Sequence, residues 1–253
     1  MSLLLTPERH HIIMSLLNKQ KVVTVHELTE ATESSESTIR RDLFQLEQEG
    51  KLLRFHGGAE RAKAKSEEVA IQDRVSQHPE EKAAIGQFAA QFVESGDCIY
   101  LDAGTTTTQM IPYLKSDVIV VTNGMTLVEH CLQMGLKTYL IGGEVKATTR
   151  AVIGRGALGS LDTYRFDKCF MGMNGVHPIH GFTTPDPEEA WIKKRAMDLS
   201  THKYVLADWT KLGRVSFAHV NTLDNTTLIT NSGQDESDLS VYEGKMTVKV
   251  VTT

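Results

Sequence analysis

The sequence predicts a winged helix-turn-helix domain followed by a larger α/β domain with a largely parallel sheet. Three short amphipathic segments precede extended residues around a Gly-Gly turn in the first 60 residues. From Pro79 onward, short apolar runs alternate with helix-like segments, a pattern typical of parallel strands covered by helices on both faces. The polar stretch between these regions sets the expected boundaries: a head at 1–60, a linker at 61–78 and a body at 79–253.

Composition places the chain among ordinary globular proteins. It has 253 residues, of which 40% are hydrophobic and 23% charged, which argues against disordered and fibrous classes. Cys98, Cys131 and Cys169 are widely spaced, so we interpret them as core residues in a reducing compartment. The N-terminus lacks a signal-peptide pattern and no apolar run reaches membrane-spanning length. We therefore expect a cytoplasmic protein without a membrane segment, and no pattern indicates a metal or cofactor.

Charge is distributed unevenly between the two parts. The whole chain has a net charge of −5, yet residues 1–65 hold ten Lys/Arg against nine Asp/Glu. Within residues 40–65 the count is seven basic to four acidic. A locally basic head on an acidic body permits nucleic-acid binding by the head alone.

The head contains signals for three helices. Thr6 is a candidate N-cap with Pro7 at the first helical position. Residues 24–27, TVHE, have capping-box spacing and predict the start of a second helix. A third helix is expected from near Ser35 to Gly50, followed by a hairpin at Gly57-Gly58.

The third helix carries the candidate DNA contacts. The N-terminal end of this helix enters the major groove in helix-turn-helix proteins, and arginine there pairs with guanine or binds phosphate. A solvated helix face, or a helical docking module, is the alternative interpretation. Together with two residues of the hairpin, the predicted DNA-binding set is Ser37, Thr38, Arg40, Arg41, Arg54 and His56.

The stretch STIRRDLFQLEQEGKLLRFHGGA, residues 37–59, resembles the DNA-binding signature of the DeoR family of bacterial sugar-responsive repressors. The sequence departs from that signature in the turn, where Glu33 to Ser37 replace the usual Gly-Val-Ser start. The resemblance implies that operator DNA is the partner of the head. Operators of this kind commonly contain two half-sites, so a homo-oligomer, a dimer or tetramer, is expected through the body.

In the body, the apolar runs predict six strands and a possible edge strand near the C-terminus. Ligands in open α/β sheets bind beyond the carboxyl ends of the strands. Hydroxyls, helix-start N–H groups and a lysine are what a phosphate needs. Four strand ends carry such residues: Asp102, Gly104, Thr105 and Thr106; Thr122 and Asn123; Gly142 and Gly143; and Asp208 and Lys211.

The body is also similar to the DeoR-family sensor domain, whose fold is that of ribose-phosphate isomerase and glucosamine-phosphate deaminase. That resemblance implies binding of a phosphorylated sugar by Asp102, Gly104, Thr105, Thr106, Thr122, Asn123 and Lys211. Residues 171–194 look most like the fructose-repressor branch, which favours fructose 1-phosphate as the effector. Lactose-type repressors that sense tagatose 6-phosphate remain an alternative.

Three further sequence patterns resemble functional motifs but are weak evidence for a site. Gly154–Gly159 match G-x-G-x-x-G, but the following strand does not end in the acid that a dinucleotide site requires. His10 and His11 are adjacent on a helix and point apart, so they are poor metal partners. Asp186 to Glu189 could be a catalytic acidic cluster, or a helix N-cap with Pro187 at the first helical position.

These observations predict a transcriptional repressor and not an enzyme. The rival is a phosphosugar isomerase or deaminase with an accessory head, in which Asp102, Asp208 or Glu188 would act as the base. No second carboxylate or histidine has a position that demands a catalytic role, so no catalytic residue is assigned.

Overall fold

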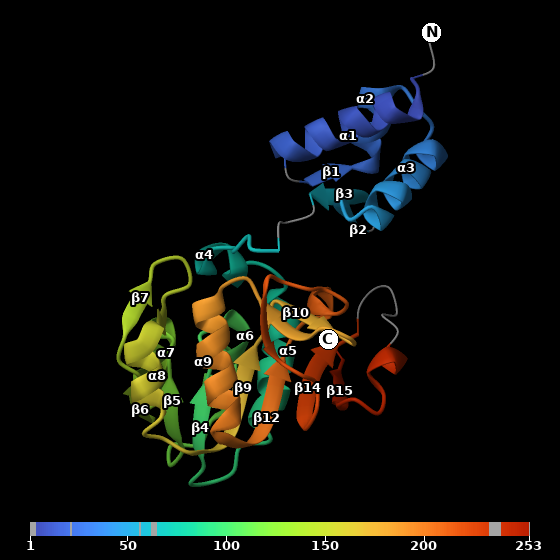
Figure 1. The fold of residues 1–253 in the computed structure, drawn as a ribbon. Coiled ribbons are helices and arrows are strands. Elements are labelled where there is room, and N and C mark those ends of the chain that lie inside the picture. Colours follow the sequence, from blue (N-terminus) through green and yellow to red (C-terminus); the bar gives the residue numbers. More distant parts are fainter. Residues whose placement is uncertain (1–3, 21, 56, 62–64, 233–238, 253) are drawn as a thin grey trace. The chain divides into compact units, whose positions relative to one another are not determined.

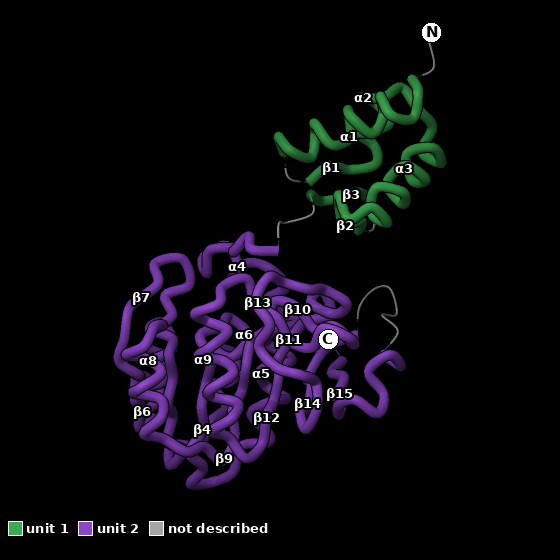
Figure 2. Tube along the Cα trace, in the orientation of Figure 1, with its two compact units in different colours: residues 1–64 green, residues 65–253 purple. Residues whose placement is uncertain are grey.

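The computed structural model describes residues 4–20, 22–55, 57–61, 65–232 and 239–252. The chain forms two compact units, residues 1–64 and residues 65–253 (Figure 2). The division falls within the segment that we expected to be a linker. Residues 58–61 form a strand of the first unit, and residues 65–78 belong to the second.

The first unit is a winged helix-turn-helix domain, as predicted (Figure 1). The third helix runs within the expected limits, and the hairpin joins the two strands that follow it. The elements are α1 (Thr6–Gln20), β1 (Val22–Thr24), α2 (Val25–Thr32), α3 (Glu36–Gln48), β2 (Leu52–Phe55) and β3 (Gly58–Arg61).

The wing contains a strand that the sequence did not predict. β1 pairs antiparallel with β3, which gives the sheet order β1-β3-β2. Gly58 lies at this crossing, where a Cβ atom would come 2.4 Å from the Val23 carbonyl oxygen. A side chain there would force the two strands apart, which explains a glycine at the second hairpin position.

Side-chain caps define where two of the head helices begin. The Thr24 hydroxyl accepts from the Glu27 N–H, and the Glu27 carboxylate accepts from the Thr24 N–H, so the predicted capping box is confirmed. Ser35 caps α3 by accepting from the Thr38 N–H. Thr6 is the first residue of α1 and not its N-cap, a shift of one position.

The unusual turn between α2 and α3 closes without an apolar residue. Glu33 ends α2 in the left-handed conformation, at φ 49°, where its N–H donates to the Thr29 carbonyl. Ser34 is half-buried, and its hydroxyl donates to the Thr32 carbonyl at 3.0 Å. Local hydrogen bonds therefore hold the turn where the family signature has other residues.

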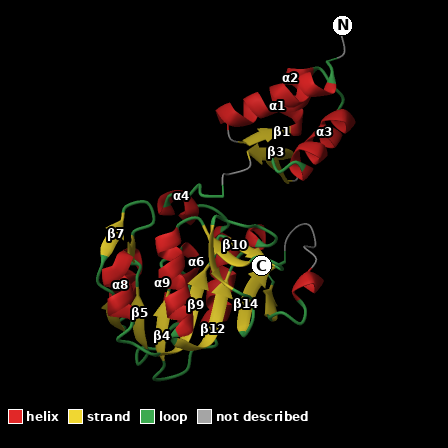
Figure 3. Ribbon diagram, viewed as in Figure 1, coloured by secondary structure: helices red, strands yellow, loops and turns green. Residues whose placement is uncertain are grey.

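The second unit is built on a parallel sheet with the order β15-β14-β12-β9-β4-β5-β6 (Figure 3). All six predicted strands are present, and the C-terminal segment adds the expected edge strand. Their bounds are β4 (Cys98–Leu101), β5 (Ile119–Thr122), β6 (Lys137–Leu140), β9 (Phe166–Gly172), β12 (Ser200–Leu206), β14 (Thr226–Asn231) and β15 (Thr247–Val251).

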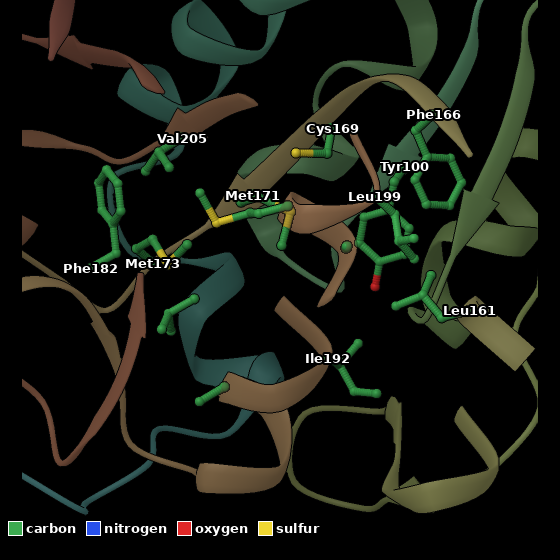
Figure 4. Packing of buried hydrophobic residues seen from close by; sticks show 14 of the residues in the cluster. Tyr100, Leu161, Phe166, Cys169, Met171, Met173, Phe182, Ile192, Leu199 and Val205 are labelled. Atoms are coloured by element: carbon green, nitrogen blue, oxygen red, sulfur yellow. The ribbon is translucent and has the colours of Figure 1, made fainter. Parts of the chain in front are cut away.

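Helices cover both faces of this sheet, as the apolar runs predicted. One face packs against α8 (Gly154–Leu161) and α9 (Pro187–Asp198), and the other against α5 (Pro79–Ala90) and α7 (Met125–Gln133). Figure 4 shows the first core, where Tyr100, Met171 and Val205 of the sheet lie with Leu161 of α8 and Ile192 of α9.

Shorter elements complete the second unit, and the alternating pattern did not reveal most of them. They are α4 (Ile71–Val75), α6 (Thr105–Thr108), the 3₁₀ helices η1 (Ile111–Tyr113), η2 (Trp209–Lys211) and η3 (Leu239–Tyr242), the hairpin β7 (Glu144–Lys146) with β8 (Ala151–Ile153), and the antiparallel sheet β10 (Gly175–His177), β11 (Gly181–Thr184) and β13 (Ala218–Asn221).

The three cysteines are free thiols. Burial raises the pKa of both Cys131 and Cys169 to about 11, and Cys98 is half-buried. Thiols with raised pKa are poor nucleophiles at neutral pH, which agrees with the interpretation of these residues as part of the core.

Candidate functional site

The candidate site lies at the carboxyl edge of the parallel sheet, where the strand order reverses. From β4 the chain proceeds outward through β5 and β6, then returns to form β9 on the other side of β4. The crevice outside such a reversal is where ligands bind in open α/β sheets. Asp102 and Asn123 directly follow β4 and β5, and Asp208 follows β12 after one intervening residue, so all three lie at this edge.

Asp102 is buried, and its carboxylate is bound from the neighbouring strand and from α9. Oδ2 accepts hydrogen bonds from the Gly172 N–H at 3.0 Å and from the Lys193 ammonium. Lys193 also donates to the Gly172 carbonyl at 3.0 Å. Oδ1 is buried and has no hydrogen-bond partner within the described part of the chain. A buried carboxylate with one free oxygen is an acceptor available to a hydroxyl group of a ligand.

Thr122 and Asn123 hold the loop that follows β4. The Thr122 hydroxyl donates to the Leu101 carbonyl at 2.6 Å and accepts from the Gly124 N–H at 3.0 Å. The Asn123 side-chain oxygen accepts from the Ala103 N–H at 2.9 Å. Both side chains are thus engaged with the backbone, which makes them positioning residues for the loop.

The four consecutive threonines divide into two pairs. The Thr107 hydroxyl donates to the Asp102 and Gly104 carbonyls at 2.7 and 2.9 Å, and that of Thr108 donates to the Gly104 carbonyl at 2.7 Å. The hydroxyls of Thr105 and Thr106 have no such partner among the described residues. Both residues are buried but retain slight exposure, at 7% and 8%. Thr105 and Thr106 are therefore the pair available to a ligand.

A second cluster of charged side chains lies around Asp208, shortly after the end of β12. Its carboxylate accepts from the Thr210 N–H at 3.1 Å and lies 3.7 Å from the Lys211 ammonium. Burial raises its pKa, but the Lys211 charge and the Thr210 hydrogen bonds outweigh burial, so the pKa lies below its usual value. Lys82 of α5 carries a third charge near this carboxylate.

The glycines assigned to the site have different surroundings. A Cβ at Gly143 would lie 2.6 Å from the Ile153 carbonyl oxygen, so this glycine allows the chain to pack against β8. The Gly142 N–H donates to the Ser160 hydroxyl at 3.3 Å. Gly104 precedes α6 in an extended conformation, at φ −155°. Packing against β8 therefore accounts for Gly143 without a ligand, whereas a Cβ at Gly142 would meet no described atom within 4 Å, so packing does not explain a glycine there.

The acidic sequence at the start of α9 is a helix cap. The Asp186 carboxylate accepts from the N–H groups of Glu188 and Glu189 at 2.7 and 3.1 Å, with Pro187 at the first helical position. The Glu189 carboxylate instead accepts from the Thr149 hydroxyl at 2.6 Å, so a full capping box does not form. Glu188 is exposed at the start of α9.

Other features do not resemble a cofactor site. The G-x-G-x-x-G residues lie in α8, which follows a strand of an antiparallel hairpin and not a strand of the parallel sheet. Among the described residues, no group of three or more His, Cys, Asp or Glu is placed to hold a metal. In the same residues, no helix has the length and apolarity needed to cross a membrane.

One polar hollow of the surface does not coincide with the candidate site. It lies at the amino ends of β12 and β14, lined by Ser200, Thr201, His202, Lys203, Tyr204, Asn225 and Thr227. The carboxyl edge instead has the unpartnered carboxylate oxygen, the available hydroxyls and the lysines. We therefore place the candidate site at this edge because of its side-chain chemistry, and not in the hollow because of its shape.

In the head, the predicted DNA contacts gather at the start of α3. Ser37, Arg40 and Arg41 are exposed, and Thr38 is half-buried with its hydroxyl 2.9 Å from that of Ser35. Arg40 pairs with Glu36 at 2.7 Å, but both side chains are more than half exposed. Exposed pairs of this kind contribute little, so the guanidinium can exchange Glu36 for phosphate or a base.

Arg54 is held within the head more firmly than the sequence suggested. Its Nε lies 2.7 Å from the Glu47 carboxylate, and its guanidinium lies over the Phe44 ring at 5.1 Å. These contacts fix the wing to α3. His56, the other predicted hairpin contact, lies outside the described residues.

The orientation of α3 depends on a buried ion pair. Arg9 of α1 donates to both oxygens of Asp42, at 2.7 and 3.0 Å, and Asp42 is 3% exposed. This hydrogen bond raises the pKa of Arg9 despite its partial burial. The bidentate geometry ties the recognition helix to α1.

Comparison with protein families accounts for both units. Residues 9–65 match the DeoR-like helix-turn-helix domain, and residues 77–232 match the DeoR C-terminal sensor domain. The chain belongs to the DeoR family. Members share this pairing of a DNA-binding head with a sensor, so the protein is a transcriptional regulator.

Curated relatives of this DeoR-family regulator align over nearly their full length. A protein of Bacillus subtilis described as the uncharacterized HTH-type transcriptional regulator FruR is 45% identical, over 98% of this chain and 99% of that one. The lactose phosphotransferase system repressor of Streptococcus mutans is 33% identical over 92% and 94%. That of Staphylococcus aureus is 30% identical over 93% and 96%.

Solved structures give more distant matches. Ribose 5-phosphate isomerase A from Methanocaldococcus jannaschii aligns with a TM-score of 0.40 and 17% identity, over 54% of this chain and 55% of that one. The eIF2B delta subunit from Chaetomium thermophilum aligns with a TM-score of 0.44 and 13% identity, over 81% and 74%.

Two lysines at the site were not identified from the sequence, although a signal was present. Lys193 is on the buried face of α9 with Ala190 and Met197, and Lys82 precedes Ile85 on the buried face of α5. A lysine at a position where helical periodicity predicts an apolar residue is a candidate for a buried charge with a specific partner.

Proposed function

We propose that this DeoR-family regulator is a repressor that binds operator DNA through α3 and is released by a phosphorylated sugar at the carboxyl edge of its sensor sheet. The observation that carries the proposal is the combination at this edge of a free buried carboxylate oxygen, two available hydroxyls and lysine charge. The carboxylate suits a sugar hydroxyl, while hydroxyls and lysine suit a phosphate.

The residues of the site take distinct roles in this proposal. Thr105 and Thr106 donate to the phosphate, and Lys211 contributes a charge from the η2 segment beside Asp208. Asp102 accepts from the sugar through Oδ1, with its other oxygen held by Lys193. Thr122 and Asn123 act indirectly, because their side chains hold the loop that carries Asp102 and the threonines.

The favoured ligand is fructose 1-phosphate. The similarity of residues 171–194 to the fructose branch supports this choice, as does the 45% identity to the relative named FruR. Tagatose 6-phosphate is the alternative, because repressors of lactose phosphotransferase systems are 30–33% identical. Titration calorimetry with fructose 1-phosphate, tagatose 6-phosphate and fructose tests the proposal. Equal heats for phosphorylated and free sugar would exclude the phosphate site.

The sensor binds its ligand without turnover. Asp208 has a lowered pKa, which makes it a weak base at neutral pH, and Asp102 is paired with Lys193. Glu188 is exposed on α9. Incubation of the protein with hexose phosphates, followed by product analysis, should reveal no isomer and no ammonia. Turnover at an enzymatic rate would favour the isomerase or deaminase alternative.

The regulator acts as a dimer or tetramer in the cytoplasm, where its operator is. The exposed edge strand β6 and the adjacent helix α7 support association, since Tyr139, Leu140, Leu132 and Met134 are all more than a third exposed. Exposed apolar residues beside an unpaired strand are typical of an interface. Light scattering of the full chain tests this, and a monomer at micromolar concentration would contradict it.

A further inference from the structure

Phe44 is a large apolar side chain that α3 presents to solvent. It is 50% exposed, although it lies on the helix that carries the candidate DNA contacts. The helix packs into the head through other residues, which are Ile39, Asp42, Leu43 and Leu46. A single exposed apolar residue is common on protein surfaces, so the position of this ring on the helix decides whether it has a role.

The position of Phe44 completes a stripe along the outward side of α3. Ser37, Arg40, Arg41 and Phe44 follow the spacing i, i+3, i+4 and i+7, and all four residues are exposed. Residues with this spacing lie on one face of an α-helix. Recognition helices of the homeodomain type read the major groove through four positions with the same spacing. Phe44 therefore extends the face of α3 that carries the two exposed arginines.

The wing covers one side of the Phe44 ring and limits its orientation. Strand β2 lies beside α3 (Figure 1), and the guanidinium of Arg54 lies over the ring at 5.1 Å. The Glu47 carboxylate accepts from the Arg54 Nε at 2.7 Å and from the Arg54 main-chain N–H at 2.9 Å. A cation held over the face of an aromatic ring attracts the ring. Phe44 is thus fixed from the side of the wing while the residue stays half exposed.

The side chains of this stripe offer different chemistry to DNA. Arginine binds phosphate or pairs with guanine, whereas the side chain of phenylalanine has no hydrogen-bonding group. The edges of the base pairs in the major groove carry one apolar group, which is the C5 methyl of thymine. An aromatic ring that faces a base edge therefore discriminates by the presence of that methyl group.

We propose that Phe44 contacts the C5 methyl of a thymine in each operator half-site, and that Glu47 and Arg54 position its ring. This inference rests on the proposed function, in which α3 binds operator DNA. Arg40 and Arg41 supply charge and hydrogen bonds at the N-terminal end of the helix, and Phe44 adds a requirement for thymine further along the same face. Phe44 is thus a specificity-determining residue of the head.

The test uses thymine without its methyl group. Operator would be selected from random DNA by binding to the full-length regulator. Each thymine would then be replaced in turn by deoxyuridine, which keeps every hydrogen-bonding group of the base. Fluorescence anisotropy measures the affinity of the wild type, of Phe44→Ala and of Phe44→Leu. Phe55→Ala is the matched control, because Phe55 is a 43% exposed phenylalanine of the same domain that lies on β2.

The variants should remain folded, because the ring of Phe44 is outside the core of the head and alanine is a better helix former than phenylalanine. Thermal unfolding verifies this. At one position of each half-site, deoxyuridine should weaken binding by the wild type about four-fold, the effect of burying one methyl group. The same replacement should leave binding by Phe44→Ala unchanged, since no ring remains to contact the methyl group. Phe44→Leu should keep part of the dependence, and Phe55→Ala should keep all of it.

Addition of the methyl group to another base provides the converse measurement. Cytosine placed at the sensitive position lacks the methyl group, and 5-methylcytosine restores it at the same point of the groove. This methylation should improve binding by the wild type and should not affect Phe44→Ala. Improvement of both proteins to the same extent would show that another residue contacts the methyl group.

Two further results would contradict the inference and leave operator binding by α3 intact. One is wild-type affinity that is unchanged when deoxyuridine replaces any thymine of the selected operator. The other is a dependence on the methyl group that persists in Phe44→Ala, which would assign it to another residue. Failure of the wild type to select any DNA sequence would overturn the proposed function together with this inference.

Discussion

The ammonium of Lys193 donates a hydrogen bond to the buried carboxylate of Asp102, and so joins α9 to the loop that follows β4. The two residues are 91 positions apart in the chain. Each is less than a tenth exposed, and the pair lies on the face of the sheet opposite to α5. The candidate site depends on this pair because it holds Asp102 with one oxygen engaged and the other available.

Removal of Lys193 should destabilise the sensor. Lys193→Met leaves the Asp102 charge buried without its cation, which predicts a loss of about 3–5 kcal/mol in the free energy of unfolding. Urea denaturation measures this loss. The double variant Lys193→Met with Asp102→Asn removes the charge as well and should recover most of the stability. If the single variant were as stable as the wild type, the buried pair would have no structural role.

The exposed arginines of α3 should be needed for DNA and not for folding. Arg40→Ala with Arg41→Ala removes the exposed pair with Glu36, which contributes little to stability, so thermal unfolding should be unchanged. Operator binding should be lost while ligand binding remains. Arg165→Ala, which removes an exposed arginine from the sensor, is the charge control. Normal retardation of operator by the double variant would contradict the assignment of α3.

The threonine run permits a matched comparison. The Thr106 hydroxyl has no partner among the described residues, whereas that of Thr108 donates to the Gly104 carbonyl. Thr106→Ala should therefore weaken binding of fructose 1-phosphate by roughly ten- to a hundred-fold while leaving operator binding intact. Thr108→Ala should lower the melting temperature and keep the affinity. The reverse pattern in calorimetry would show that the assignment within the run is wrong.

Ligand affinity should fall with rising pH because of Lys82. Its pKa of about 8 in the ligand-free protein means that the ammonium, which attracts phosphate, is lost as pH rises through 8. A sugar phosphate is already doubly charged above a pKa of about 6 and does not titrate in this range. Between pH 7 and pH 9 affinity should drop roughly ten-fold, since about a tenth of the lysine stays charged one unit above its pKa. This dependence should be absent in Lys82→Met, and its persistence there would assign it to another group.

Local patterns in the sequence predicted most of the fold. The TVHE capping box and the CIYL strand were predictable because each depends on residues close together in the chain. The three-residue strands β1, β7, β8 and β10 were not, because so short a segment carries no alternation of its own. Their pairing depends on partners distant in sequence.

The candidate site was predicted less completely than the fold. The strand ends could be found because the carboxyl edge of a parallel sheet collects whatever follows each strand. The division of the threonines into two pairs depends on backbone carbonyls placed by the turn at Gly104, which no residue pattern encodes. Lys82 and Lys193 reach the edge from helices on opposite faces of the sheet, so their roles follow only from the three-dimensional arrangement.

The most direct test of the central claim measures operator release by the full-length protein. Fluorescence anisotropy of a labelled operator, selected from random DNA by binding to the regulator, would be followed as fructose 1-phosphate, tagatose 6-phosphate or fructose is added. A phosphorylated sugar should release the DNA, and free fructose at the same concentration should not. Equal release by fructose, or operator retained at saturating concentrations of both phosphorylated sugars, would contradict the account of this edge as a sugar-phosphate sensor.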